Sequence, residues 1–93
     1  MAKFWKIRGY RGLQLIFERA IPLGSLSDSE VELMLQRLQA RHITEGEVVG
    51  ASLRKGTAGY RHDFEILRNS GGTFGLMTTS TDFHYSATVE DSD

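Results

Sequence analysis

The sequence predicts an α+β fold, in which one amphipathic helix packs on one face of an antiparallel or mixed β-sheet of about five to six strands. Two observations predict this class. Apolar and polar residues alternate in several short runs, as they do in half-buried strands. One longer run, over residues 27–43, repeats its apolar residues at three- and four-residue spacing, which is typical of a helix. Short connections join the runs in the order β-β-α-β-β-β.

Length and composition narrow the class of protein. The chain has 93 residues, the usual size of one domain, and Leu, Ile, Val and Phe supply 24 of them, which is enough for a core. The absence of cysteine excludes a disulfide-stabilised scaffold and a thiolate metal site. The first residues lack the apolar run of a secretory signal, and no stretch approaches the roughly 20 apolar residues that cross a bilayer. We therefore expect a cytoplasmic protein with no membrane partner.

Charge is unevenly distributed along the chain. The net charge is −1, but all eleven Lys and Arg residues lie at or before Arg68, and residues 69–93 carry four acidic residues and no basic one. Short charged ends of this kind are commonly frayed. We expect a single domain over residues 1–89 and an acidic, frayed tail over 90–93.

Residues 4–21 are predicted to form two strands of a hairpin. The stretch 9–12, Gly-Tyr-Arg-Gly, supplies turn residues between two alternating runs. Pro22 cannot donate a hydrogen bond to a sheet and therefore marks the exit from the second strand. The residues expected to face the helix are Trp5 and Ile7 in the first strand and Leu13, Leu15 and Phe17 in the second.

Ser27 marks the start of the helix. Its hydroxyl can accept a hydrogen bond from a free amide of the first turn, and Glu30 can reach back to the Ser27 amide. Leu26 and Val31 can pack together as a hydrophobic staple across this start. The apolar stripe that follows consists of Val31, Met34, Leu35, Leu38 and His42, and we expect the helix to span about 27–43.

The remaining strands are expected after the helix. Residues 48–53 alternate in apolar and polar character and predict the third strand, and 64–67 and 74–79 predict the next two regions of strand. Asn-Ser-Gly-Gly at 69–72 is a strong turn signal between them. Residues 83–89 show the clearest alternation in the chain and predict the last strand.

The tripeptide Gly-Tyr-Arg occurs at 9–11 and again at 59–61, each time in an expected loop beside further cations. Tyrosine can stack on a base and arginine can bind a phosphate through two hydrogen bonds, so two such loops could bind nucleic acid or another anion. The chain is not basic overall, however, and glycine and tyrosine are also ordinary hairpin residues. The candidate residues for this site are Arg8, Tyr10, Arg11, Arg54, Lys55, Tyr60 and Arg61.

The three histidines, His42, His62 and His84, include no closely spaced pair of metal ligands, so no metal and no cofactor are expected. We assign no catalytic residue. A pocket that pairs His62 or His84 with a carboxylate would indicate a small enzyme or ligand carrier.

Sorting the expected strands by face leaves apolar side chains on the side away from the helix, where a one-helix domain has nothing to cover them. Contiguous exposed apolar surface usually marks a binding site. The leading hypothesis is therefore a small interaction module that acts by binding. We expect it to form a homodimer through this open face or an edge strand, and a different protein partner is also possible. The candidate interface residues are Phe4, Ile16, Val48, Leu67 and Met77. Two alternatives remain: these side chains are scattered and individually tolerated, or Leu33 and Ala40 on the helix form the contact surface.

Overall fold

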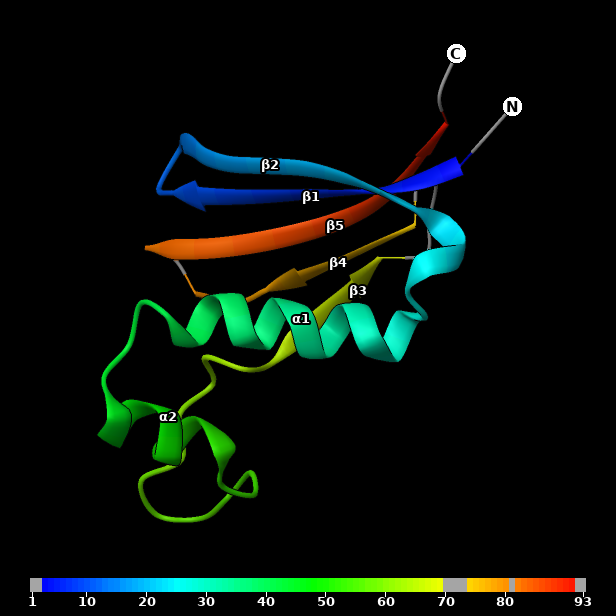
Figure 1. Cartoon of the computed structure of the whole chain (residues 1–93). Coiled ribbons are helices and arrows are strands. Elements are labelled where there is room, and N and C mark those ends of the chain that lie inside the picture. The colour runs from blue at the N-terminus through cyan, green and yellow to red at the C-terminus, as the bar shows by residue number, and fades with distance from the viewer. Residues whose placement is uncertain (1–2, 70–73, 81, 92–93) are drawn as a thin grey trace.

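The computed structural model describes residues 3–69, 74–80 and 82–91. Five strands form one fully antiparallel sheet in the order β2-β1-β5-β4-β3, and both helices lie on the same side of it (Figure 1). In chain order the elements are β1 (Lys3–Arg11), β2 (Gln14–Pro22), the short 3-10 helix η1 (Leu23–Ser25), α1 (Asp28–Ala40), α2 (Glu45–Ser52), β3 (Ile66–Asn69), β4 (Gly75–Thr78) and β5 (Phe83–Asp91). The predicted α+β class with a single sheet is confirmed.

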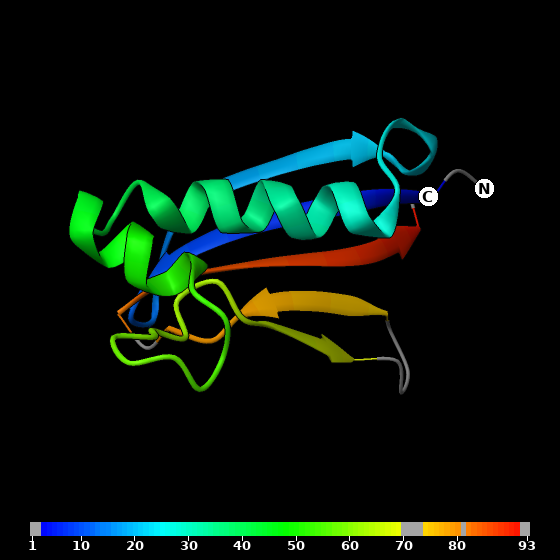
Figure 2. The ribbon, with the colours of Figure 1, turned by 90° about the horizontal axis from the view of Figure 1, so that it is seen from below.

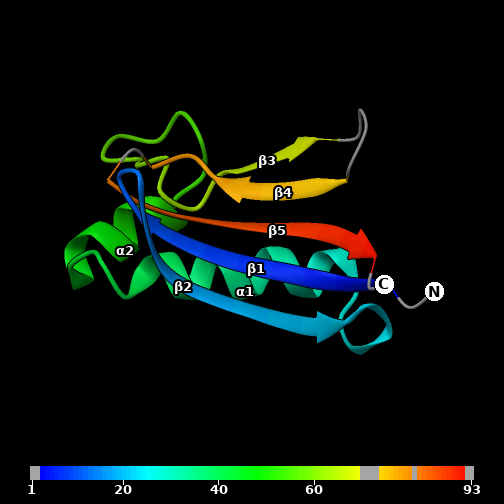
Figure 3. The same cartoon turned by 90° about the horizontal axis from the view of Figure 1, so that it is seen from above.

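Register divides the sheet into two faces, because residues paired across antiparallel strands point to the same side. Trp5 pairs with Val89 and Ile7 with Ala87, and these side chains face α1. The residues between them face the other way. We call the side that carries α1 the helix face and the other side the open face, which Figure 3 views from above with no helix in front of it.

The core lies between α1 and the helix face. It consists of Trp5, Ile7, Val31, Leu35, Leu76, Tyr85 and Ala87, all of which are buried. Trp5 also donates a hydrogen bond from Nε1 to the carbonyl oxygen of Leu26, 3.2 Å away, which ties β1 to the segment that precedes α1. Gly9 makes room for the Tyr85 ring, since a Cβ atom there would come within 2.5 Å of it.

The predicted helix start is confirmed in detail. The Glu30 amide donates to Ser27 Oγ at 3.3 Å, and the Ser27 amide donates to Glu30 Oε1 at 2.9 Å. The hydrogen bond from the Ser27 amide to the carboxylate is the main reason that the pKa of Glu30 is lowered. The helix ends at Ala40, earlier than the predicted residue 43.

The predicted strand over residues 48–53 is wrong, because these residues belong to α2 and the connection that follows it. Thr44 and Glu47 form a second capping box, with the Glu47 amide donating to Thr44 Oγ1 at 3.2 Å and the Thr44 amide donating to Glu47 Oε1 at 2.8 Å. Four amides at a helix start need partners, and this box satisfies two of them. A local start signal therefore prevails over a short alternating pattern that suits either structure.

The first hairpin turns later than predicted. β1 continues to Arg11, and the turn is formed by Gly12, which has a positive φ of 61°, and Leu13. Leu13 is consequently fully exposed in the turn, and Leu15 pairs with Tyr10 on the open face, so neither faces the helix as predicted. The turn predicted at 69–72 falls largely on residues 70–73, outside the described residues.

The predicted frayed tail is also wrong for the two residues of it that the structure describes. β5 extends to Asp91, and Glu90 Oε2 accepts hydrogen bonds from Arg8 at 2.8 Å and from the Thr88 hydroxyl at 2.7 Å. The bond from Arg8 is the main reason that the pKa of Glu90 is lowered. Asp91 pairs with Lys3 at 3.8 Å. The acidic residues therefore extend the last strand, and the domain reaches at least to residue 91. Neither helix in the described part of the chain has the length and apolar content needed to cross a bilayer.

Two leucines on α1 provide a test of this packing. Leu35 is completely buried whereas Leu33 is 46% exposed. We expect Leu35→Ala to lower the free energy of unfolding by about 2–5 kcal/mol, because it leaves a cavity against the sheet. Leu33→Ala should change it by no more than about 0.5 kcal/mol. Urea unfolding followed by circular dichroism measures both, and equal losses would contradict the orientation of α1.

Candidate interaction surfaces

The residues predicted to bind anions do not form one basic surface. Arg8 lies on the open face, where its guanidinium contacts Glu18 at 3.1 Å and Glu90 at 2.8 Å. Tyr10 lies within β1 and not in a loop, and its ring stacks on His84 with 5.1 Å between centroids. Both side chains of this first group are therefore engaged inside the sheet.

The second Gly-Tyr-Arg tripeptide lies in the connection after α2, on the other side of the sheet (Figure 1). Arg61 contacts Asp63 at 2.8 Å and Glu47 at 3.1 Å, which raises the pKa of its guanidinium and ties this connection to α2. Tyr60 donates a hydrogen bond to Glu65, and Lys55 lies 4.0 Å from the same carboxylate. The remaining candidates are Arg11, which lies over the Phe83 ring, and Arg54, which is exposed.

A small polar cleft of about 200 Å³ lies at the C-terminal end of α1, between α2 and the start of β5. His42 Nε2 lies 2.5 Å from the Tyr85 hydroxyl, and the His42 ring stacks on Phe83 with 3.9 Å between centroids. Burial lowers the pKa of His42, and the charge of Arg41 lowers it further. Burial also raises the pKa of Tyr85. The cleft therefore favours a neutral imidazole beside a neutral phenol.

The histidines proposed for a small enzyme have no carboxylate partner in the part of the chain that the structure describes. His62 Nδ1 lies 3.4 Å from the Thr79 hydroxyl. His84 stacks on Tyr10, and its Nδ1 is buried with no hydrogen-bond partner among the described residues. Those residues also include no cluster of three or more potential metal ligands.

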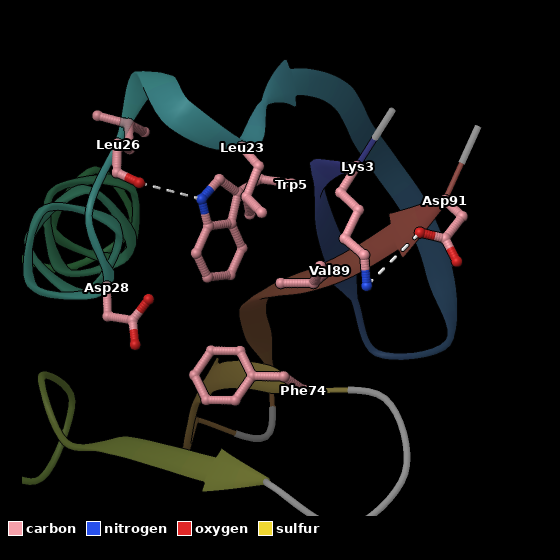
Figure 4. Close-up of a pocket in the computed structure, with 8 residues that line it drawn as sticks. All are labelled: Lys3, Trp5, Leu23, Leu26, Asp28, Phe74, Val89 and Asp91. Atoms are coloured by element: carbon pink, nitrogen blue, oxygen red, sulfur yellow. Dashed lines mark hydrogen bonds and ion pairs between the residues drawn. The ribbon is translucent and has the colours of Figure 1, made fainter. Parts of the chain in front are cut away.

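A hollow of about 670 Å³ opens where α1 begins (Figure 4). Trp5, Leu23, Phe74 and Val89 line its apolar part, and Lys3, Asp28 and Asp91 lie around it. These charges are already paired: Lys3 with Asp91 at 3.8 Å, and Asp28 with Arg68 at 3.4 Å. The hollow therefore offers apolar surface and no unpaired charge to hold a charged ligand.

A ridge of two apolar side chains crosses the open face near its β3 edge. Leu67 and Met77 pair across β3 and β4, and they are 55% and 40% exposed. A hollow of about 450 Å³ lies on one side of this ridge, where small residues such as Gly75 and Ser86 form part of the lining. A second hollow of about 370 Å³ lies on the other side and includes Leu13 and His84 in its lining.

The remaining predicted interface residues do not join this ridge. Ile16 is 43% exposed but lies in β2, at the opposite edge of the sheet, next to an irregularity in the pairing with β1. Phe4 is half-buried and pairs with Glu90. Val48 is in α2 and not in the sheet, so its assignment to the open face is wrong. The structure thus brings two of the five predicted residues together.

The middle of the open face is charged and internally paired. Glu18 contacts Arg8 at 3.1 Å and Lys6 at 3.8 Å, and Arg8 also contacts Glu90 at 2.8 Å. This group contains two cations and two anions, and no net charge.

The sequence pattern of β2 does not indicate how exposed this strand is. Eight of its nine residues are exposed, and among the described strands it pairs only with β1. A hollow of about 200 Å³ separates it from α1, lined by Ile7, Phe17, Arg19, Ile21, Met34 and Leu38. The alternating pattern of β2 correctly indicates a strand, but it carries no information on which side chains the helix reaches.

Comparison with known proteins finds no matching family model, no similar curated protein and no similar solved structure.

The environment of His42 leads to a pH prediction. The pKa of His42 lies below the value of about 6.5 found in unfolded chains. Between these two values the unfolded state binds more protons, so the free energy of unfolding decreases as the pH is lowered through this window. Substituting His42→Gln removes this contribution, while the carboxylates contribute equally to both proteins.

We therefore expect the variant to lose less stability than the wild type between about pH 7.5 and about pH 5, as measured by urea unfolding. Leu33→Gln, a change at an exposed residue that does not titrate, is the control and should show the pH dependence of the wild type. Identical pH dependence for wild type and His42→Gln would contradict the prediction.

Proposed function

We propose that this chain is an interaction module that acts by binding and not by catalysis, and that it forms a homodimer through the open face of its sheet. One observation carries the proposal. The exposed ridge of Leu67 and Met77 lies between two hollows, on a sheet face that has no covering layer in the described chain (Figure 3). Exposed apolar side chains beside hollows are typical of protein interfaces.

The energetics favour covering this ridge. Burying a Leu or Met side chain contributes roughly 1.5–3 kcal/mol. Leu67, Met77 and the fully exposed Leu13 lie around the same hollow, so their contributions combine in one contact. Part of this gain offsets the loss of rotational and translational freedom on association.

The charges on the open face suit a second copy of the chain. Lys6 and Arg8 supply two cations and Glu18 and Glu90 supply two anions. In a two-fold dimer each patch faces itself, and a patch with equal numbers of both signs can place cations opposite anions. A patch of one sign would repel its copy.

Nucleic-acid binding receives less support, since Arg8 and Arg61 already contact carboxylates and the other cations are dispersed. Phosphate binding depends on cations that can approach the nucleic acid together. A cytoplasmic location is also part of the proposal, since a chain without cysteine cannot form the disulfide bridges that stabilise many small secreted domains.

The dimer is tested by placing charge on the ridge. We expect the wild type to sediment at twice the 10.4 kDa mass of the chain in analytical ultracentrifugation. Leu67→Glu and Met77→Glu should each shift it to the monomer, because an unpaired carboxylate would be buried at the contact. Both side chains are exposed, so the fold should survive, which circular dichroism verifies.

Leu33→Glu is the matched control, since Leu33 is also an exposed leucine but lies on α1, on the other side of the sheet. It should remain dimeric. A wild-type monomer at high micromolar concentration would refute the dimer, and a dimer lost only in Leu33→Glu would move the contact to the helix.

A further inference from the structure

β2 presents an unused strand edge. It is the outermost strand on its side of the sheet, so the backbone N–H and C=O groups that point away from β1 have no strand partner in the described chain. The strand is nine residues long, and eight of these residues are exposed. A long free edge of this kind is a template on which another extended segment can pair.

The flank beside this edge is apolar. Figure 2 shows β2 running along one side of α1, and a hollow of about 200 Å³ separates the two elements. Phe17 and Ile21 line the hollow from β2, and Met34 and Leu38 line it from α1. Phe17 remains 40% exposed. A strand added to β2 would therefore place alternate side chains next to an apolar groove on the helix face.

Arg19 lies between these two apolar residues of β2. It pairs with Ile7 across the sheet, which puts it on the helix face, and it also lines the hollow. Within the described chain it has no ion pair, in contrast to Arg8, Arg61 and Arg68. A carboxylate on an added strand, directly opposite Arg19, would form a charge-assisted hydrogen bond with it.

We propose that the free edge of β2 binds an extended segment of a partner protein as a sixth strand, and that this segment has the pattern apolar-x-acidic-x-apolar. The period of two in a strand places these three side chains on one face. They would lie opposite Phe17, Arg19 and Ile21. The residues between them would lie on the side of Glu18, which already contacts Lys6 and Arg8.

A second copy of β2 does not meet this requirement. Paired residues of an antiparallel sheet share a face, so Arg19 of one copy would lie opposite a helix-face residue of the other. The helix-face residues available are Phe17, Arg19 and Ile21, and none is acidic. Self-pairing at the middle of the strand also places Arg19 opposite Arg19, or Glu18 opposite Glu18, and like charges in this position are destabilising.

The test titrates the full chain, labelled with ¹⁵N, with the peptide acetyl-KTVTETVTK-amide. We expect the amide signals of residues 14–22 to move most. Replacing the central glutamate of the peptide by lysine should weaken binding about tenfold, since it exchanges attraction for repulsion at Arg19. Arg19→Glu should weaken binding of the first peptide by a similar factor and restore binding of the lysine peptide.

A backbone control separates strand addition from simple contact between side chains. Successive N–H groups of an extended peptide point to opposite edges. Methylating alternate backbone nitrogens along one edge should abolish binding, whereas methylation along the other edge should preserve it. Equal binding of both methylated peptides overturns the proposal.

The remaining outcomes are equally decisive. If the amide signals of residues 14–22 do not shift at millimolar peptide, the proposal is overturned. It is also overturned if a second copy of the chain is the only occupant of the β2 edge, which loss of the dimer in Phe17→Lys would reveal. The open-face dimer is tested separately, because it uses Leu67 and Met77, which lie near the opposite edge of the sheet. Leu67→Glu should therefore bind the peptide as the wild type does, whatever its oligomeric state.

Discussion

The width of a single helix is the constraint on which the rest of this structure depends. An α-helix with its side chains is about 10 Å wide, whereas the outer strands of a five-stranded sheet lie about 19 Å apart. α1 packs through Val31 and Leu35 onto Trp5, Ile7, Tyr85 and their neighbours, over the middle of the sheet. The hydrogen bond from Trp5 to Leu26 ties the segment before the helix to β1. Within the part of the chain that the structure describes, one helix in this position leaves β2 uncovered on its flank and the open face without a layer.

Both proposed binding surfaces are exposed because α1 covers only the middle of one face of the sheet. The ridge of Leu67 and Met77 is exposed because no element of the described chain lies over the open face, and Phe17 is exposed because α1 stops short of β2. The charged residues are arranged differently, since most arginines near these surfaces contact carboxylates of the same chain. The described chain therefore exposes apolar side chains and a strand edge, and Arg19 is a cation without an ion pair on the helix face of that edge.

The sequence predicts features that depend on neighbouring residues, such as helix starts. It does not predict features that depend on contacts between distant segments. Ser27 and Glu30 identify the start of α1 because a capping box is built from residues three positions apart. The same spacing at Thr44 and Glu47 identifies α2, although the alternating residues after it suggest a strand. Exposure of β2 depends on where α1 lies, which residues 14–22 do not encode. The contact of His42 with Tyr85 joins residues 43 positions apart and has no signature in either segment.

Arg8 shows how a single side chain can select one alignment of strands. From β1 it reaches Glu18 on β2 and Glu90 on β5, so one guanidinium spans three adjacent strands. A slip of either neighbour by one residue would turn its glutamate to the opposite face, and the contact would be lost. The correct register is thus selected by a polar contact on the open face, which the apolar core does not contact. β2, an edge strand that packs weakly against the helix, can in this way still pair with β1 in one register.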